Sequence, residues 1–286
     1  MRDAIRSAAE TLAAAGVDSP EHDAKALAAH VLGLAKLSDL LLADGFDKGQ
    51  AAAYAELVAR RAQRVPLQHL TGSVGFRYIE LEVGPGVFVP RPETESVVQW
   101  AVDAIAREGW TAPVLADLCT GSGTIAFALA NEVPGATVHA VERDPDALAW
   151  TRRNAANRVA AGDPEVHLHL GSVEESLLDL DGQFDLVASN PPYVATHETH
   201  IPDPEVIDHD PEIALFAGED GLDVIRLVEQ AARRLLKPGG LVVVEHSDRQ
   251  GKTAPEVFAD WDEVADHQDL TGRDRYVSAR KPADWS

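Results

Sequence analysis

The chain has 286 residues, enough for one large domain and one small one, and its apolar fraction of 45% is ordinary for a protein with a packed core. Its formal net charge is −22, from 47 acidic and 25 basic residues. This balance disfavours tight, sequence-independent binding to nucleic acid, which needs clustered Lys and Arg opposite the phosphates. The simplest interpretation of the acidity is that it maintains solubility.

The cysteine content and the N-terminal sequence both favour a cytoplasmic protein. Cys119 is the single cysteine, so an intramolecular disulfide bond is excluded and a reducing compartment is favoured. Charges at Asp3, Arg6 and Glu10 interrupt the apolar core that a signal peptide needs. No apolar run reaches the roughly 20 residues of a membrane-spanning helix, so we expect no membrane partner.

Residues 1–70 are predicted to form a small bundle of helices. Ser19 followed by Pro20 is typical of a helix start, because the hydroxyl can cap the first turn and proline fits its first position. Apolar residues then recur at helical spacing between Ala24 and Leu32. This part would be a domain of its own.

Residues 71–92 are predicted to form a β-hairpin that links the bundle to the rest of the chain. In residues 79–83 apolar side chains alternate with glutamates, which is typical of a strand with one wet face. Gly-Pro-Gly at 84–86 is a turn signal. Residues 87–89 would then begin the returning strand.

From residue 93 to 286, strand and helix patterns alternate, which predicts a doubly wound, mostly parallel α/β sheet covered on both faces. Two further strand patterns, 262–270 and 274–281, are separated by only three residues and predict a hairpin at one sheet edge, with an antiparallel strand there. The other strands are expected at 113–119, 137–142, 166–170, 184–189 and 241–246, and the helices at 124–132, 145–160 and 222–236.

The turn after the first of these strands has the composition of a nucleoside-binding loop. In "ADLCTGSGTIA" (116–126), Gly121 and Gly123 permit a tight turn and close approach of a ligand. Glu142 ends the next strand, where an acid commonly binds ribose hydroxyls. The third glycine of a pyrophosphate-binding loop is missing, so the pattern favours S-adenosylmethionine, and a tight turn without ligand is the alternative. Cys119 is interpreted as a small buried side chain and not as a nucleophile.

A stiff corner follows the strand at 184–189, in "VASNPPYVAT" (187–196). Proline cannot donate to a sheet, so the strand must end here, and each proline holds the residue before it in an extended conformation. The corner would present two acceptors, the side-chain carbonyl of Asn190 and the backbone carbonyl of Pro191, together with the aromatic face of Tyr193. Two acceptors can bind both hydrogens of a planar NH2 group and aim its nitrogen at an electrophilic methyl group.

These motifs together strongly resemble the N5-glutamine methyltransferases that modify peptide-chain release factors, a branch of the class I S-adenosylmethionine-dependent methyltransferases. The resemblance covers nearly the whole chain. The Asn-Pro-Pro-Tyr tetrad alone is shared with adenine-N6 methyltransferases, and the combination with "PRPETE" narrows the family. The segments that carry the resemblance are "VFVPRPETE" (87–95), "ADLCTGSGTIAFALA" (116–130), "AVERDPDAL" (140–148), "SNPPYV" (189–194), 210–246 and "DLTGRDRYV" (269–277).

The resemblance implies a Rossmann-like catalytic domain at 93–286, a helical substrate-recognition domain at 1–70 and a hairpin linker at 71–92. The implied substrate is the glutamine of the Gly-Gly-Gln loop of bacterial class 1 release factors, and no metal is implied. Asn190, Pro191 and Tyr193 would be catalytic, and with Pro192 they would bind the glutamine amide. The implied contacts to the cofactor are Cys119, Thr120, Gly121, Ser122, Gly123, Glu142 and Asn190.

The sequence departs from the family at two positions. Cys119 stands where the family usually has glycine, and Ser172 where an acid is common. We therefore assign the apolar contact with the adenine ring to Val173, the next residue.

Two segments outside these motifs carry alternative interpretations. Residues 194–220 are predicted to be a long loop over the carboxyl end of the sheet, either a plain connection or a lid. His197 and His200 lie in it, and a polar loop is favoured over a zinc site. The basic stretch "ARRAQR" (59–64) is either a solvated helix face or part of a docking surface for the protein substrate.

Three other functions compete with glutamine methylation of release factors. An adenine-N6 methyltransferase of DNA or RNA is disfavoured by the net charge. A methyltransferase for glutamine of a ribosomal protein is disfavoured by "PRPETE". A regulator that binds the cofactor without turnover is disfavoured by the intact Asn190 and Tyr193. We expect a monomer that binds no nucleic acid directly.

Overall fold

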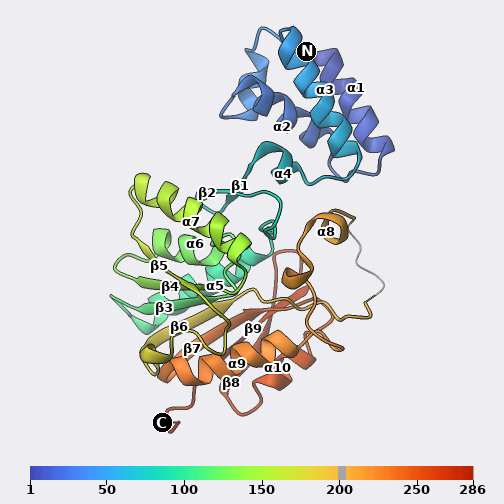
Figure 1. The fold of residues 1–286 in the computed structure, drawn as a ribbon. Helices are drawn as coiled ribbons and strands as arrows, with labels where there is room; N and C mark the ends of the chain where they lie inside the picture. The colour runs from blue at the N-terminus through green and yellow to red at the C-terminus, as the bar shows by residue number, and fades with distance from the viewer. Residues whose placement is uncertain (199–203, 286) are drawn as a thin grey trace. The chain divides into compact units, whose positions relative to one another are not determined.

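The computed structural model describes residues 1–198 and 204–285 (Figure 1). The chain divides into two compact units. The helical unit comprises Met1–Ser73, Val83–Pro85 and Ile201–His209, and the sheet unit comprises Val74–Glu82, Gly86–His200 and Asp210–Ser286. Both units are therefore discontinuous in sequence, whereas the predicted domains are continuous ranges. Residues 199–203 of the predicted loop, with His200, lie outside the described residues.

The helical unit packs around small and branched apolar side chains, among them the fully buried Leu12 and Leu27. A capping box begins one of its helices, because the Asp47 side chain accepts from the Gln50 backbone and Gln50 returns the bond. Its elements are α1 (Arg2–Ala14), α2 (Pro20–Leu32), the 3-10 helix η1 (Leu37–Leu41), α3 (Lys48–Ala62), α4 (Leu67–Thr71) and α8 (Pro204–His209).

The basic stretch at 59–64 is not simply a solvated helix face. Arg61 is 7% exposed and donates to Asp23 and Glu205, at 2.7 Å and 2.6 Å, and Arg64 also binds Glu205. Glu205 belongs to α8, so a buried ion cluster fixes this short helix to α3. Buried charges must be paired to be tolerated, and here each has a partner.

The predicted hairpin exists but lies earlier in the chain. Its strands are β1 (Ser73–Phe76) and β2 (Ile79–Glu82), with the turn at Arg77 and Tyr78. Arg77 adopts a φ of 50°, a conformation that its residue type does not signal. The expected returning strand at 87–89 is wrong, since the Val89 N–H donates to the Asp210 side chain at 3.4 Å instead of to a strand.

The sheet unit is a seven-stranded sheet in the order β5-β4-β3-β6-β7-β9-β8. Helices α5, α6 and α7 cover one face and α9 and α10 the other, each over its own apolar core (Figure 1). The elements are α5 (Thr94–Glu108), β3 (Val114–Leu118), α6 (Thr124–Glu132), β4 (Thr137–Glu142), α7 (Pro145–Ala160), β5 (Val166–Leu170), η2 (Leu178–Leu180), β6 (Phe184–Ser189), η3 (Glu212–Ala214), α9 (Asp223–Leu235), β7 (Leu236–Glu245), α10 (Thr253–Val257), β8 (Asp262–Gln268) and β9 (Asp274–Arg280).

The alternation predicted from the sequence is confirmed, including the hairpin at the sheet edge. The antiparallel strand is β9, which lies between β7 and β8 and pairs antiparallel with both. Helix α5 was missed, although Val97, Ala101 and Ile105 bury one helical face. No helix within the described ranges is long and apolar enough to cross a membrane.

Candidate active site

The candidate site lies where the carboxyl ends of four strands meet. The parallel register aligns Leu118 of β3 with Ser189 of β6, and it aligns the same ends of β4 and β7 alongside them. Ligands of doubly wound sheets bind at this edge, where the strand order reverses. The residues at these strand ends, or directly after them, therefore form a row in the order Glu142, Cys119, Asn190 and Glu245.

The glycine turn between β3 and α6 needs its glycines. Gly121 and Gly123 adopt φ values of 59° and 92°, in the left-handed region that other residues avoid. A Cβ on Gly123 would lie 2.0 Å from the ring of Phe127, so no other residue fits without rearrangement. The side chains of Thr120 and Ser122, which were assigned to the cofactor, are both buried.

Two side chains of α7 brace this turn. Thr151 Oγ1 donates to the carbonyl of Gly121 at 2.6 Å, and Asn154 Nδ2 donates to the carbonyl of Ser122 at 2.9 Å. Asn154 also exchanges two hydrogen bonds with the backbone of Glu82 in β2, at 2.7 Å and 3.0 Å. The shape of the loop is therefore set by a helix some 30 residues away in sequence. Neither residue stands in a motif that predicts this role from the sequence.

Asp117, in the strand before the turn, stabilises the turn through its side chain. Its Oδ2 accepts from the Thr120 hydroxyl and from the Ala126 N–H, the latter at 3.0 Å, at the start of α6. Its Oδ1 is buried with no hydrogen-bond partner among the described residues. Burial raises the pKa of Asp117 to about 7, and these two hydrogen bonds oppose the rise.

Glu142 faces the glycine turn from the end of β4. Its two carboxylate oxygens accept from the N–H groups of Gly121 and Asp144, both at 2.8 Å. Burial raises the pKa of Glu142, and hydrogen bonds from the backbone oppose this. A carboxylate has about four acceptor sites, so Glu142 retains acceptors for further donors such as ribose hydroxyls.

Cys119 and Val173 are both packed against the apolar core on the α9 face. Cys119 has a φ of 62°, where a Cβ is strained and glycine is not. Burial raises the pKa of its thiol above the ordinary range, which leaves it a poor nucleophile. Val173 is 6% exposed, so little of its side chain is available to a ligand in this conformation.

The Asn-Pro-Pro-Tyr corner directly follows β6 and is held by buried groups. The Asn190 side chain donates to Thr94 Oγ1 at 3.2 Å, and the Tyr193 hydroxyl donates to Glu245 at 3.3 Å. Pro191 is buried and Pro192 is half-buried. The structure thus brings the glycine turn, Glu142 and the proline corner together, as the sequence predicted.

The described start and end of the 194–220 segment pair with each other and are not an open loop. Val194 forms a parallel bridge with Phe216, and the Thr196 N–H donates to the Gly218 carbonyl at 2.8 Å. A Cβ on Gly221 would lie 2.4 Å from the Tyr193 carbonyl, so glycine is required beside the corner.

Comparison with known proteins first defines the class. Residues 113–281 match the family model of a methyltransferase domain, and residues 3–72 match the PrmC N-terminal domain. A solved structure of the T. thermophilus 16S rRNA N2 G1207 methyltransferase, in complex with AdoMet and guanosine, is similar with a TM-score of 0.51 at 19% identity. It covers 73% of this chain and 49% of its own, and this likeness is one of fold alone. The fold is that of a class I methyltransferase.

The curated relatives then define the family. Release factor glutamine methyltransferase of Streptomyces coelicolor is 53% identical over 97% of this chain and 96% of its own length. The enzyme of the same name from Mycolicibacterium smegmatis is 47% identical over 99% and 98%. The chain therefore belongs to the release factor glutamine methyltransferases, and it is a protein-glutamine methyltransferase.

Proposed function

We propose that this enzyme transfers a methyl group from S-adenosylmethionine to the side-chain amide nitrogen of the glutamine in the Gly-Gly-Gln motif of bacterial class 1 release factors. The observation that carries the proposal is the register of β3 and β6, which aligns Leu118 with Ser189. It sets the turn assigned to the cofactor beside the corner assigned to the amide. The family membership supports the same substrate.

The acceptors and the glycine backbone of the site support this cofactor. Glu142 offers free acceptor positions for ribose hydroxyls, and Gly121 and Gly123 allow a ligand to approach the backbone between Cys119 and Gly123. Val173 remains our assignment for the contact with the adenine ring. Because this side chain is buried, the ligand would have to open the site around it. Bound S-adenosylmethionine would supply an electrophilic methyl group on a positively charged sulfur.

The corner would supply orientation. The side-chain carbonyl of Asn190 and the backbone carbonyl of Pro191 would accept the two N–H hydrogens of the glutamine amide. Its nitrogen would then point its lone pair at the methyl carbon; as the N–C bond forms, the C–S bond breaks and its electrons stay on sulfur. The cationic amide loses its proton to water. Tyr193 would pack against the amide plane, and positioning of this kind supplies much of the rate.

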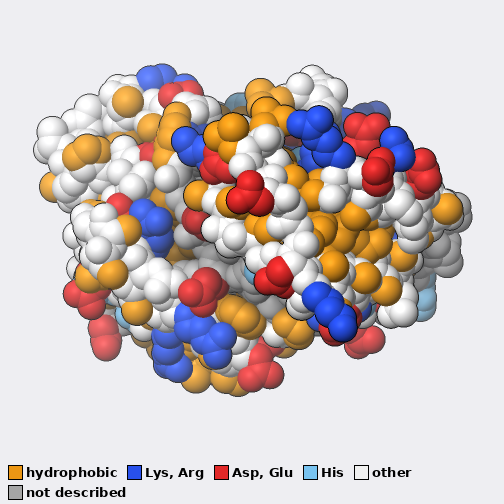
Figure 2. Space-filling view, turned by 90° about the horizontal axis from the view of Figure 1, so that it is seen from above, with side chains coloured by type: hydrophobic (Ala, Val, Ile, Leu, Met, Phe, Trp, Pro, Cys, Tyr) orange, Lys and Arg blue, Asp and Glu red, His pale blue; other side chains and the backbone are white. Residues whose placement is uncertain are grey.

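Nucleic acid is the rival substrate. In the view of Figure 2 the Lys and Arg side chains lie in several small groups between acidic and apolar ones. A non-specific phosphate-binding surface would gather them along one groove. The helical unit and the segment 194–220 are our proposed contacts with the protein substrate. We further propose that the enzyme acts as a monomer in the cytoplasm, where translation factors work.

The proposal is tested by incubating the enzyme with labelled S-adenosylmethionine and either a release factor, a ribosomal protein mixture or DNA. We expect label on the Gly-Gly-Gln glutamine of the release factor, located by mass spectrometry. Label in DNA or in ribosomal protein, with none in the release factor, would overturn the proposal.

The cofactor assignment is tested separately by calorimetry. Because Glu142 would lose its hydrogen bonds to ribose, Glu142→Ala should weaken the binding of S-adenosylmethionine roughly 10- to 100-fold, in line with about 1.5–3 kcal/mol for bonds to a charged group. Glu175→Ala, at an exposed acid after β5, is the control. An unchanged dissociation constant in Glu142→Ala would refute the ribose contact.

A further inference from the structure

The Asn190 carboxamide can face a substrate with either of two ends. Its carbonyl oxygen accepts hydrogen bonds and its NH2 group only donates them. Methylation of an amide nitrogen, as proposed above, needs the carbonyl, because the substrate's NH2 group also only donates. A 180° flip of the side chain would put the NH2 group of Asn190 against the NH2 group of the substrate and abolish the hydrogen bond between them. Something in the protein must therefore select one orientation.

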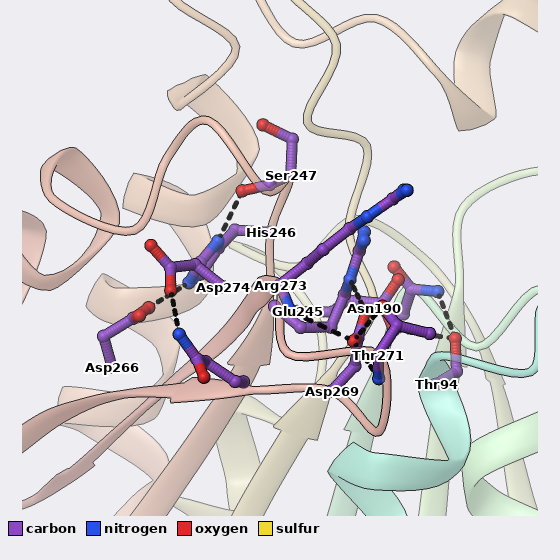
Figure 3. A network of polar contacts seen from close by, with 12 residues as sticks. Thr94, Asn190, Glu245, His246, Ser247, Asp266, Asp269, Thr271, Arg273 and Asp274 are labelled. Atoms are coloured by element: carbon purple, nitrogen blue, oxygen red, sulfur yellow. Dashed lines mark hydrogen bonds and ion pairs between the residues drawn. The ribbon is translucent and has the colours of Figure 1, made fainter. Parts of the chain in front are cut away.

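The selecting group is the hydroxyl of Thr94. Thr94 Oγ1 lies 3.2 Å from Asn190 Nδ2 and 2.7 Å from Glu245 Oε2 (Figure 3). A threonine hydroxyl has one hydrogen, and an ionised carboxylate can only accept. The hydrogen of Thr94 therefore goes to Glu245, which leaves only lone pairs directed at Asn190. Only the NH2 end of the amide can meet them.

The hydrogen-bonded pair of Thr94 and Glu245, here called the relay, is buried, and both residues are fixed by further hydrogen bonds. Thr94 is 2% exposed and Glu245 is 1% exposed, so water does not compete for these bonds. Thr94 lies in the first turn of α5, where its N–H donates to the carbonyl of Arg91 at 3.2 Å. Glu245 ends β7 and also accepts from the Tyr193 hydroxyl at 3.3 Å. No described residue donates to Oδ1 of Asn190, so that oxygen is available.

We infer that Thr94 and Glu245 are positioning residues which turn the Asn190 carboxamide so that its carbonyl oxygen faces the substrate. The inference rests on the proposed function and deepens it. It also gives a physical role to Thr94 of the motif at 87–95.

The first test compares Thr94→Val with Thr94→Ser. Valine keeps the shape and removes the hydroxyl, whereas serine keeps the hydroxyl. We expect at least a tenfold loss of kcat for Thr94→Val on release factor, with the dissociation constant of S-adenosylmethionine changed less than twofold. Thr94→Ser should stay within threefold of the wild type. A kcat for Thr94→Val near the wild-type value would overturn the inference, as would an equal loss in both variants.

Glu245→Gln provides a second test that does not depend on the folding of Thr94→Val. Its matched control is Asp185→Asn, a buried carboxylate near the amino end of the neighbouring strand β6, where it accepts from Val114 N–H and Lys237. We expect a severalfold loss of kcat in Glu245→Gln only. An equal loss in Asp185→Asn, or none in Glu245→Gln, would contradict the inference.

A pH profile adds a readout that a merely structural role would not move. Burial raises the pKa of Glu245 to about 7; Thr94, Tyr193, Arg275 and Glu93 are the other groups that act on it. Once protonated, Glu245 can donate to Thr94, and the selection is lost. The wild-type kcat at saturating cofactor should therefore fall below about pH 7, and Glu245→Gln should lack this limb. A limb retained in Glu245→Gln would argue against the relay.

Methylation of glutamine by the wild type decides the proposed function. The ratio of the kcat of each variant to that of the wild type decides the inference. If the wild type instead labels an adenine amino group, the proposed function fails. The comparison of Thr94→Val with Thr94→Ser can then be repeated on that substrate.

Discussion

Asn190 is the residue on which the proposed chemistry depends most directly. Because the side-chain carbonyl of Asn190 is the proposed acceptor for the substrate amide, Asn190→Ala should lower kcat by about 100-fold or more, the range seen when one oriented polar group is removed from an active site. Binding of S-adenosylmethionine, measured by calorimetry, should change only severalfold. Asn157→Ala, at an exposed asparagine of α7, is the control and should behave as wild type. Near-normal turnover in Asn190→Ala would remove the basis of the mechanism.

Cys119 illustrates how backbone geometry limits substitution at a single residue. Its φ of 62° is strained for any side chain and worst for a β-branched one. Cys119→Val should therefore lower the free energy of unfolding by about 2 kcal/mol or more. In Cys119→Gly, relief of this strain offsets the greater freedom of the unfolded chain, so the change should stay within about 1 kcal/mol.

Urea unfolding of these two variants measures both changes. If Cys119→Val proves as stable as Cys119→Gly, the left-handed conformation at this position is not a property of the folded protein in solution. A left-handed conformation favours glycine, which agrees with the glycine that the family usually has at this position.

Single residues of the site could be predicted from the sequence where the motif is local. Gly121, Gly123 and Asn190 stand next to strand ends that are themselves recognisable, so their placement followed from the strand pattern. Thr94 and Glu245 could not be found in this way. They lie 151 positions apart, and only the register of β7 and the docking of α5 bring them together.

At the scale of elements, the turn between β3 and α6 links its stability to pH through Asp117. The pKa of Asp117 is raised to about 7 in the fold, against about 3.9 in an unfolded chain. The folded state therefore holds its proton to higher pH. The contribution of Asp117 to stability is full below about pH 4 and is lost as the pH rises towards 7, by about 4 kcal/mol at most.

Asp117→Asn removes this titration while it keeps an acceptor for Thr120 and Ala126. We expect the difference in unfolding free energy between wild type and Asp117→Asn to shift against the wild type between pH 4 and pH 7. Urea titrations at several pH values measure it. A difference that is constant over this range would show that Asp117 titrates normally.

Elements with strong local signals were predicted with the bounds that the structure has. Helices 124–132 and 145–160 each follow a clear start signal, a glycine turn in one and Asp144-Pro145 in the other. The hairpin was misplaced because its turn, Arg77-Tyr78, has none of the residues that normally signal one, while Gly84-Pro85-Gly86 does. Tertiary packing, not local preference, decides such cases.

At the scale of the whole molecule, the net charge of −22 is the dominant property. Mutual repulsion of like charges destabilises a compact state, and salt screens it, because the Debye length falls from about 10 Å at 0.1 M to about 3 Å at 1 M. We therefore expect the melting temperature to rise as NaCl increases from 0.02 M to about 0.5 M. A fall would mean that local ion pairs, such as the cluster around Glu205, outweigh the net repulsion.

The position of β9 has a consequence for biosynthesis. This strand is made after every other strand of the sheet, yet it fills the place between β7 and β8. While the nascent polypeptide still lacks residues 274–280, the apolar second half of β7, residues 241–245, has an unpaired flank open to β-pairing with other chains. The sheet therefore cannot be completed strand by strand in the order in which the ribosome makes the strands. The newborn enzyme should depend on chaperones, or on rapid completion of its last stretch, to avoid aggregation.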